Sequence, residues 1–159
     1  MSGLRKAAFI DRDGVINVDS GYVGRWEDFR FAPDAVAMLQ RLADEGYLLV
    51  VITNQSGIAR GYFSEADYEL LTDRYREALA AQGIRIAAVY HCPHHPQGTV
   101  AQFTRSCDCR KPAPGMILRA IRELGIDPAA SILIGDSERD IEAGRAAGVG
   151  RLVRVERAV

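Results

Sequence analysis

Residues 48–52 form an unbroken apolar run, Leu-Leu-Val-Val-Ile. A strand that is apolar on both faces is typical of a parallel sheet covered by helices on both sides. Further apolar runs at 7–10, 84–90, 132–134 and 152–155 alternate with segments of helical periodicity. This alternation predicts an α/β fold, a Rossmann-like and mostly parallel sheet with helices on both faces.

Four helices are expected between these strands, because residues that start and stop helices bracket each periodic segment. The brackets are Pro33 and Gly46, Ser64 and Gly83, Pro112 and Gly125, and Glu138 and Gly148. Residues 16–31, which we call the flap, lack helical periodicity and contain two glycines. No insertion between these elements is long enough to form a separate cap domain, so we expect one domain over residues 1–159.

The balance of charges limits the kinds of partner. The chain has 20 Lys and Arg against 21 Asp and Glu, so it has no basic surplus for binding nucleic acid. We find neither a secretory leader nor an apolar segment long enough to span a membrane. Only three cysteines are present, which argues against a disulfide framework and for a reducing compartment. We expect a cytoplasmic monomer with a small-molecule substrate.

Polar side chains follow three of the predicted strands, at the point where each strand ends. They are Asp11 and Asp13, Thr53 and Asn54, and Asp136 with Asp140. Each pair alone is more often a turn or a helix cap than a functional site. Ligands of open α/β sheets bind beyond the carboxyl ends of the strands, so three such endings together predict a site there.

The types of residue at this edge suit the hydrolysis of a phosphate monoester. Asp11 and Asp136 can hold a divalent cation through oxygen ligands. Asp11 can attack phosphorus to give an aspartyl phosphate, and Asp13 can protonate the departing alkoxide and then deprotonate water. The transferring group needs hydrogen-bond donors and positive charge, which Thr53, Asn54 and Lys111 would supply.

Residues 91–109, which we call the Cys/His segment, contain all three cysteines and all three histidines of the chain. Cys92, His94, Cys107 and Cys109 match the donor set of a closed tetrahedral zinc site. His91 and His95 are competing ligands that spacing does not exclude, and incidental thiols are the alternative to a metal. We expect a structural zinc that staples this loop and fixes the cations after it, Arg110 and Lys111.

The motifs Asp11-Arg12-Asp13-Gly14-Val15, Thr53-Asn54, Lys111-Pro112 and Gly135-Asp136-x-x-x-Asp140 resemble those of the haloacid dehalogenase superfamily of phosphatases, in the same order. The resemblance implies that Asp11 is the nucleophile and Asp13 the acid/base. It implies a magnesium ion held by Asp11, the Asp13 carbonyl and Asp136. Thr53 and Lys111 would stabilise the phosphoryl group, with Asp140 in support.

The Cys/His segment narrows the resemblance to capless members, namely the heptose bisphosphate phosphatases and the related histidinol-phosphate phosphatases. The flap and the residues after the second strand resemble the heptose family more closely. The substrate contacts implied are Asp19, Ser20, Gly21, Tyr22, Thr53, Asn54, Gln55, Ser56, Arg110 and Lys111. Many relatives have His where this chain has Ser20 and Lys where it has Ser137, so contacts at these two positions are open.

An uncapped site with Arg60, Arg105 and Arg110 nearby suits a substrate with a second anionic group. Together with this, the resemblance to the heptose family implies removal of the 7-phosphate from a heptose 1,7-bisphosphate, a step of lipopolysaccharide heptose biosynthesis, with the 1-phosphate retained. Histidinol phosphate and other small phosphoesters, including a nucleic acid 3′-phosphate end, are alternative substrates. A non-catalytic zinc-bound interaction module is a remote alternative, because both Asp11 and Asp13 are intact.

Overall fold

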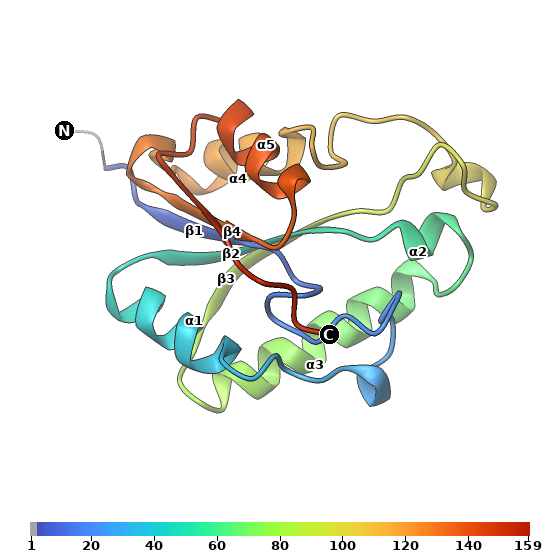
Figure 1. Ribbon diagram of the computed structural model, residues 1–159, viewed down its shortest axis with the longest axis horizontal. Coiled ribbons are helices and arrows are strands. Elements are labelled where there is room, and N and C mark those ends of the chain that lie inside the picture. Colours follow the sequence, from blue (N-terminus) through green and yellow to red (C-terminus); the bar gives the residue numbers. More distant parts are fainter. Residues whose placement is uncertain (1–2) are drawn as a thin grey trace.

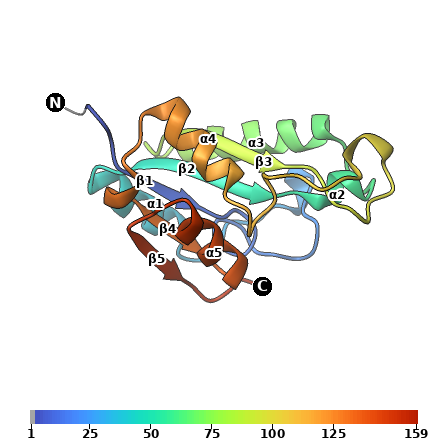
Figure 2. The same cartoon turned by 90° about the horizontal axis from the view of Figure 1, so that it is seen from above.

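A computed structural model of the chain describes residues 3–159. Five parallel strands form one sheet in the order β3-β2-β1-β4-β5, and they lie side by side in Figure 2. β1 therefore lies in the middle of the sheet, between β2 and β4. The strands are β1 Ala7–Ile10, β2 Leu48–Asn54, β3 Ile86–Cys92, β4 Ile132–Gly135 and β5 Arg151–Arg154.

Helices cover both faces of the sheet, as the sequence predicts (Figure 1). The α-helices are α1 Ala35–Asp44, α2 Ser56–Ala59, α3 Glu65–Ala80, α4 Gly115–Leu124 and α5 Glu138–Ala146. Short 3-10 helices are η1 Trp26–Asp28, η2 Ala101–Phe103 and η3 Pro128–Ala130. The apolar sides of α1 and α3 pack on one face of the sheet, and those of α4 and α5 pack on the other.

Alternation along each strand produces these two core layers. Ala8 and Ile10 of β1 join the layer beneath α1 and α3, whereas Ala7 and Phe9 join the layer beneath α4 and α5. All four side chains are completely buried. This two-sided burial explains why β1, β2 and β4 have no polar side chains until they reach their carboxyl ends.

The third strand differs from its predicted span. It runs to Cys92 because the parallel ladder with β2 continues through Thr53 opposite His91 and Asn54 opposite Cys92. The first cysteine of the Cys/His segment is therefore fixed at the end of a strand, and the irregular part begins after it. The short helix α2 and the three 3-10 helices also lacked a predictive pattern, since each is too short to show periodicity.

Predicted helix boundaries are confirmed at two places. Ser64 and Asp67 form a reciprocal capping box at the start of α3. Gly125 ends α4 in the left-handed conformation, with φ of 64°. Among residues 3–159, we find no helix with the length and hydrophobicity needed to span a membrane.

Candidate active site

A pocket of about 520 Å³ opens where β1, β2 and β4 end. Most of the side chains that the sequence assigns to a site line it together: Asp11, Asp13, Asp19, Gly21, Tyr22, Asn54, Gln55, Ser56, Arg110, Lys111, Asp136 and Asp140. Two predicted residues do not line it. Ser20 is exposed to solvent, and Thr53 is fully buried with its hydroxyl accepting a hydrogen bond from Gln55 Nε2 at 2.8 Å.

A buried lysine lies between two carboxylates at the base of the pocket. Lys111 Nζ donates to Asp11 Oδ1 at 3.0 Å, to Asp140 Oδ1 at 2.5 Å and to the Ile52 carbonyl at 3.1 Å. Burial favours loss of the Lys111 proton, but the two carboxylates outweigh it and raise the lysine pKa. The ammonium charge is thus held at the place where a phosphoryl group next to Asp11 would carry negative charge.

The surroundings of Asp11 disfavour its charged form. Burial raises the pKa of Asp11 to about 8, and repulsion from Asp140 and Asp136 adds to this effect against the attraction of Lys111. Because this value already includes the attraction of Lys111, the carboxyl needs a second cation to be mostly ionised at neutral pH. A perturbed pKa of this kind, in a cleft, is typical of catalytic groups.

Asp11, Asp136 and Asp140 place carboxylate oxygens within 4.8 Å of one another, which fits a magnesium ion. Asp140 is already engaged: its Oδ2 accepts from the backbone N–H groups of Asp136 and Ser137 at 3.1 and 3.2 Å. Its pKa is raised by burial and lowered by Lys111, and the net shift is downward. Asp11 and Asp136 are therefore the carboxylates with oxygens left to bind a cation.

Asp13 is held by donors from three positions. Its Oδ1 accepts from Arg12 Nη2 at 2.7 Å and from Asn17 Nδ2 at 3.0 Å, and its Oδ2 accepts from Gln55 Nε2 at 3.0 Å. The sequence had assigned Gln55 to the substrate, whereas the structure places its amide between Asp13 and Thr53. Arg12 and Asn17 were missed, because neither residue type in that position has a distinctive pattern.

Asn54 joins the end of β2 to Lys111. Its side-chain amide donates to the Lys111 carbonyl at 3.2 Å, and its Oδ1 accepts from the Lys111 N–H at 3.0 Å. These two bonds fix the Lys111 backbone 57 residues further along the chain. The polar atoms of Asn54 thus position the lysine as well as facing the pocket.

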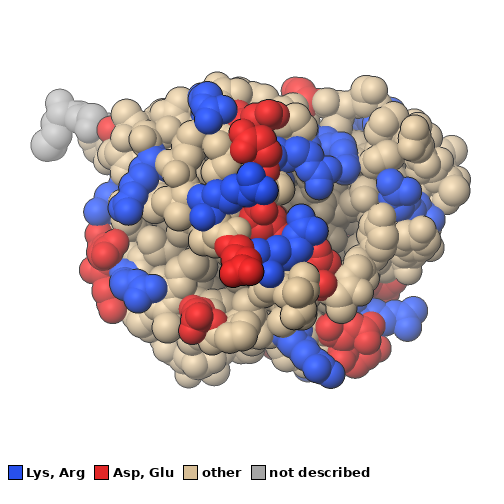
Figure 3. All heavy atoms as spheres, in the orientation of Figure 1, with Lys and Arg blue, Asp and Glu red and all other residues tan. Residues whose placement is uncertain are grey.

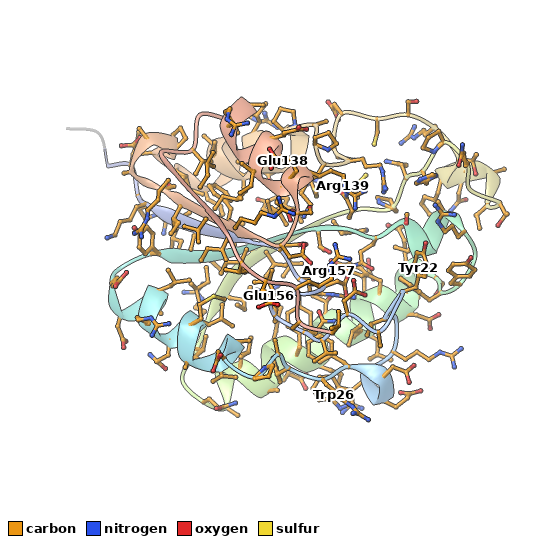
Figure 4. All side chains as sticks on the ribbon, in the orientation of Figure 1. Tyr22, Trp26, Glu138, Arg139, Glu156 and Arg157 are labelled. Carbon is orange, nitrogen blue, oxygen red and sulfur yellow. The ribbon has the colours of Figure 1, made fainter. Side chains whose placement is uncertain are left out.

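The C-terminal segment, residues 155–159, runs along the opening of the pocket. Its backbone hydrogen bonds reach the carbonyls of Gly135 and Gly14, each at 2.9 Å, and the N–H of Asp19 at 2.8 Å. Arg157 Nε donates to Asp136 Oδ2 at 2.8 Å, and Arg157 and Arg139 both line the pocket (Figure 4). The sequence analysis missed both arginines, since a lone arginine after a last strand or in a first helical turn has no distinctive pattern.

Gly14 makes this close approach possible. Its φ is 87°, and a Cβ there would overlap Asp136 Oδ2 and come within 2.9 Å of the Arg157 side chain. A glycine directly after Asp13 therefore lets the segment that carries the two aspartates pass against the end of β4.

Three arginines line the pocket without a carboxylate partner among the described ion pairs: Arg60, Arg110 and Arg139. Arg60 Nε and Arg110 Nη1 are buried and have no hydrogen-bond partner. Burial, and then repulsion from Arg139, lowers the pKa of Arg110. Arg105 does not line the pocket; it donates to His94 Nε2 at 2.9 Å. On the face shown in Figure 3, basic and acidic side chains are interspersed.

Of the three candidate histidines in the Cys/His segment, His94 is the one that lies beside the three cysteines. Cys92, His94, Cys107 and Cys109 place their ligand atoms within 4.8 Å of one another, and Cys107 Sγ is 3.4 Å from Cys92 Sγ. These three sulfurs and one imidazole nitrogen fit a closed zinc site. His91 instead contacts Glu65 at 2.9 Å, and the His95 ring accepts from the Gln97 N–H at 3.0 Å.

Comparisons with known proteins agree with this geometry. The chain is 50% identical over 149 residues to the D-glycero-beta-D-manno-heptose-1,7-bisphosphate 7-phosphatase of Escherichia coli (strain K12), covering 94% of this chain and 78% of that protein. It is 48% identical over 151 residues to the D-glycero-alpha-D-manno-heptose-1,7-bisphosphate 7-phosphatase of Photorhabdus laumondii, covering 95% and 82%.

A solved structure is similar over most of its length. The D,D-heptose 1,7-bisphosphate phosphatase from B. bronchiseptica, complexed with magnesium and phosphate, superposes with a TM-score of 0.82 at 36% identity, covering 92% of this chain and 78% of that one. The haloacid dehalogenase-like hydrolase family matches residues 10–148. The chain therefore belongs to the haloacid dehalogenase-like hydrolases.

Proposed function

We propose that this chain is a magnesium-dependent phosphatase that removes the 7-phosphate of D-glycero-D-manno-heptose 1,7-bisphosphate. The observation that carries the proposal is that one pocket is lined by two sets of charged residues. One set is Asp11, Asp13 and Lys111, and the other is three arginines without a carboxylate partner among the described ion pairs, Arg60, Arg110 and Arg139. A monophosphate needs only the first set, whereas a bisphosphate needs both. Relatives about half identical to this chain are named as phosphatases of this substrate.

In the first step, an oxygen of the Asp11 carboxylate attacks phosphorus and the bond to the leaving oxygen breaks. Lys111, 3.0 Å from Asp11, neutralises charge on the transferring group. Asp11, the Asp13 carbonyl and Asp136 would hold magnesium, which when bound supplies a Lewis acid for the phosphoryl oxygens. Thr53, expected to act on the phosphoryl group, would instead act through Gln55: its buried hydroxyl accepts from Gln55 Nε2, which also donates to Asp13.

Asp13 serves both halves of the reaction. Its carboxyl gives a proton to the departing alkoxide, and the resulting carboxylate then takes a proton from the water that attacks the aspartyl phosphate. Hydrolysis of that intermediate releases inorganic phosphate and restores Asp11. Asp140 supports the cycle by holding Lys111 and the end of β4 in place.

The second phosphate would be bound by Arg60, Arg110 and Arg139, because phosphate oxygens match the forked donors of guanidinium groups. The flap residues Asp19, Gly21 and Tyr22, with Ser56 of α2, line the same pocket and would contact the sugar. Ser20 remains a proposed substrate contact although its side chain is exposed, because its neighbours Asp19 and Gly21 line the pocket.

A structural zinc in the Cys/His segment is part of the proposal, because the cluster closes immediately before Arg110 and Lys111. Free cysteines that bind zinc suit a reducing compartment, which supports a cytoplasmic enzyme of lipopolysaccharide heptose biosynthesis. We also propose that the enzyme acts as a monomer.

The proposal is tested by comparing substrates. Phosphate release is measured with heptose 1,7-bisphosphate and with histidinol phosphate, in magnesium and after EDTA, for the wild type and for Asp11→Asn. We expect a higher kcat/KM for the bisphosphate, loss of activity in EDTA and no turnover by the variant. A higher kcat/KM for histidinol phosphate would reverse the assignment of the substrate.

A further inference from the structure

Arg12 is among the largest fully buried side chains of the protein, yet it lies between the two proposed catalytic aspartates. Burying a guanidinium in a protein interior costs several kcal/mol unless its donors are paired. Nη2 is paired: it donates to Asp13 Oδ1 and to the Val23 carbonyl, each at 2.7 Å. One nitrogen therefore connects the proposed acid/base to the middle of the flap.

Other buried polar atoms of Arg12 and of α3 have no hydrogen-bond partner among the described residues. Arg12 Nε and Nη1 are buried without a protein acceptor, and so are the hydroxyls of Tyr68, Thr72 and Tyr75. These three residues lie on one face of α3, at spacings of four and three residues. Arg12 and both tyrosines influence one another's pKa, so the groups are close in space.

We infer that Arg12 is a positioning residue, held from behind by the hydroxyl cluster of α3, which orients Asp13 for protonation of the leaving group. The inference rests on the proposed phosphatase activity but not on the identity of the sugar. In this inference, the cluster of Tyr68, Thr72 and Tyr75 restrains the guanidinium through shared internal water.

The hydrogen bonds make the two oxygens of Asp13 unequal. Oδ1 accepts from both Arg12 and Asn17, whereas Oδ2 accepts only from Gln55. The proton for the alkoxide is therefore carried on Oδ2. When the bond between phosphorus and the leaving oxygen breaks, the alkoxide takes that proton and leaves as an alcohol, and Asp13 becomes a carboxylate paired with Arg12.

Two substrates with different leaving groups test this role. An alkyl phosphate such as β-glycerol phosphate needs a proton at its leaving oxygen, whereas p-nitrophenyl phosphate releases a stable anion that needs none. Because kcat/KM reports steps only up to departure of the leaving group, the alkyl-to-aryl ratio isolates the work of Asp13. General acids raise the reaction rate by roughly 10²–10⁴-fold, so a misaligned general acid loses part of that rate enhancement.

The variants are Arg12→Lys, which keeps a charge but loses the planar fork, and Thr72→Val, which removes one hydroxyl at nearly constant volume. We expect Arg12→Lys to lower kcat/KM for the alkyl phosphate about tenfold or more beyond its effect on the aryl phosphate. Thr72→Val should lower the same alkyl-to-aryl ratio less strongly. Tyr90→Phe is the control, because the Tyr90 hydroxyl donates to Glu123 Oε1 and does not line the pocket.

Equal losses on both substrates, or no loss in either variant, would overturn the inference, because a merely structural role of Arg12 affects both substrates alike. Thr72→Val keeps the test decisive if Arg12→Lys does not fold. Both substrates are generic, so a preference for a sugar other than heptose would change the assignment of the substrate and leave this ratio unaffected.

Discussion

Arg157 Nε lies 2.8 Å from Asp136 Oδ2, so the C-terminal segment places a cation on a carboxylate of the candidate magnesium site. The same guanidinium is 3.9 Å from Asp19 of the flap. A residue only two positions from the end of the described chain thereby connects the end of β4 with the flap.

This pairing gives the first prediction. Arg157→Gln removes a cation that competes with magnesium for Asp136, so we expect tighter binding of Mg²⁺. The arginine is half-exposed, and exposed pairs contribute about 0.2–1 kcal/mol, which corresponds to an affinity gain of roughly 1.4- to fivefold. Isothermal titration calorimetry with MgCl₂ and no substrate measures it.

Arg139→Gln is the matched control, since it removes the same charge from the pocket lining without a described carboxylate contact. It should change the Mg²⁺ affinity less than Arg157→Gln does. Weaker binding by Arg157→Gln would mean that the arginine supports the site and does not compete for it.

The second prediction concerns Asp11 and the pH dependence of stability. Burial raises the pKa of Asp11 to about 8 in the metal-free fold, against about 3.9 in an unfolded chain. The folded state therefore holds more protons between these values, and the free energy of unfolding falls as pH rises from about 4 towards 8. Asp11→Asn has no charge to bury, so its metal-free stability should exceed that of the wild type more at pH 8 than at pH 5.

Urea denaturation in EDTA at the two pH values measures this difference. Adding Mg²⁺ at pH 8 should stabilise the wild type but not Asp11→Asn, because the cation compensates the carboxylate charge. If the stability of Asp11→Asn exceeds that of the wild type by less at pH 8 than at pH 5, the assigned direction of the Asp11 pKa shift is wrong.

The third prediction concerns Lys111. Replacement by Met leaves Asp11 and Asp140 buried without their shared cation, and breaking a buried ion pair in this way costs about 3–5 kcal/mol. We expect a lower urea midpoint and no phosphatase activity. The double variant Lys111→Met with Asp140→Asn should regain part of the stability but none of the activity, which separates folding from catalysis.

The fourth prediction concerns zinc. His94 Nδ1 lies 3.4 Å from Cys109 Sγ, whereas His91 contacts Glu65. We expect about one zinc per chain in the wild type and in His91→Asn, and loss of zinc in His94→Asn and Cys107→Ala. Metal content is measured by mass spectrometry and thermal stability by calorimetry. Retention of zinc and full activity in Cys107→Ala would rule out a stapling role.

Much of the site could be predicted because it is a consequence of parallel strands. Asp11, Asn54 and Asp136 each follow a run of buried residues, and the ends of neighbouring parallel strands must meet at one edge. Lys111 was predictable only from its place among the other motifs, because a lysine before a proline has no pattern that indicates burial. Its side chain is only 4% exposed.

The remaining features depend on tertiary contacts between segments without periodicity. The ladder that extends β3 to Cys92 requires β2 as a partner, and the position of Arg157 requires the turn after β5. Only the structure identifies His94 as the candidate zinc ligand, because it shows that His91 contacts Glu65 and that His95 accepts from the Gln97 N–H. Spacing along the chain contains none of these contacts.

The ion pairs of Lys111 join positions 100 and 29 residues apart in the chain. During synthesis, the proposed nucleophile Asp11 leaves the ribosome early, whereas Lys111 and Asp140 follow only after most of the chain has been made. A nascent chain that lacks β4 and α5 also lacks Asp136 and Asp140. The proposed active centre is therefore complete only when the last part of the chain has been synthesised.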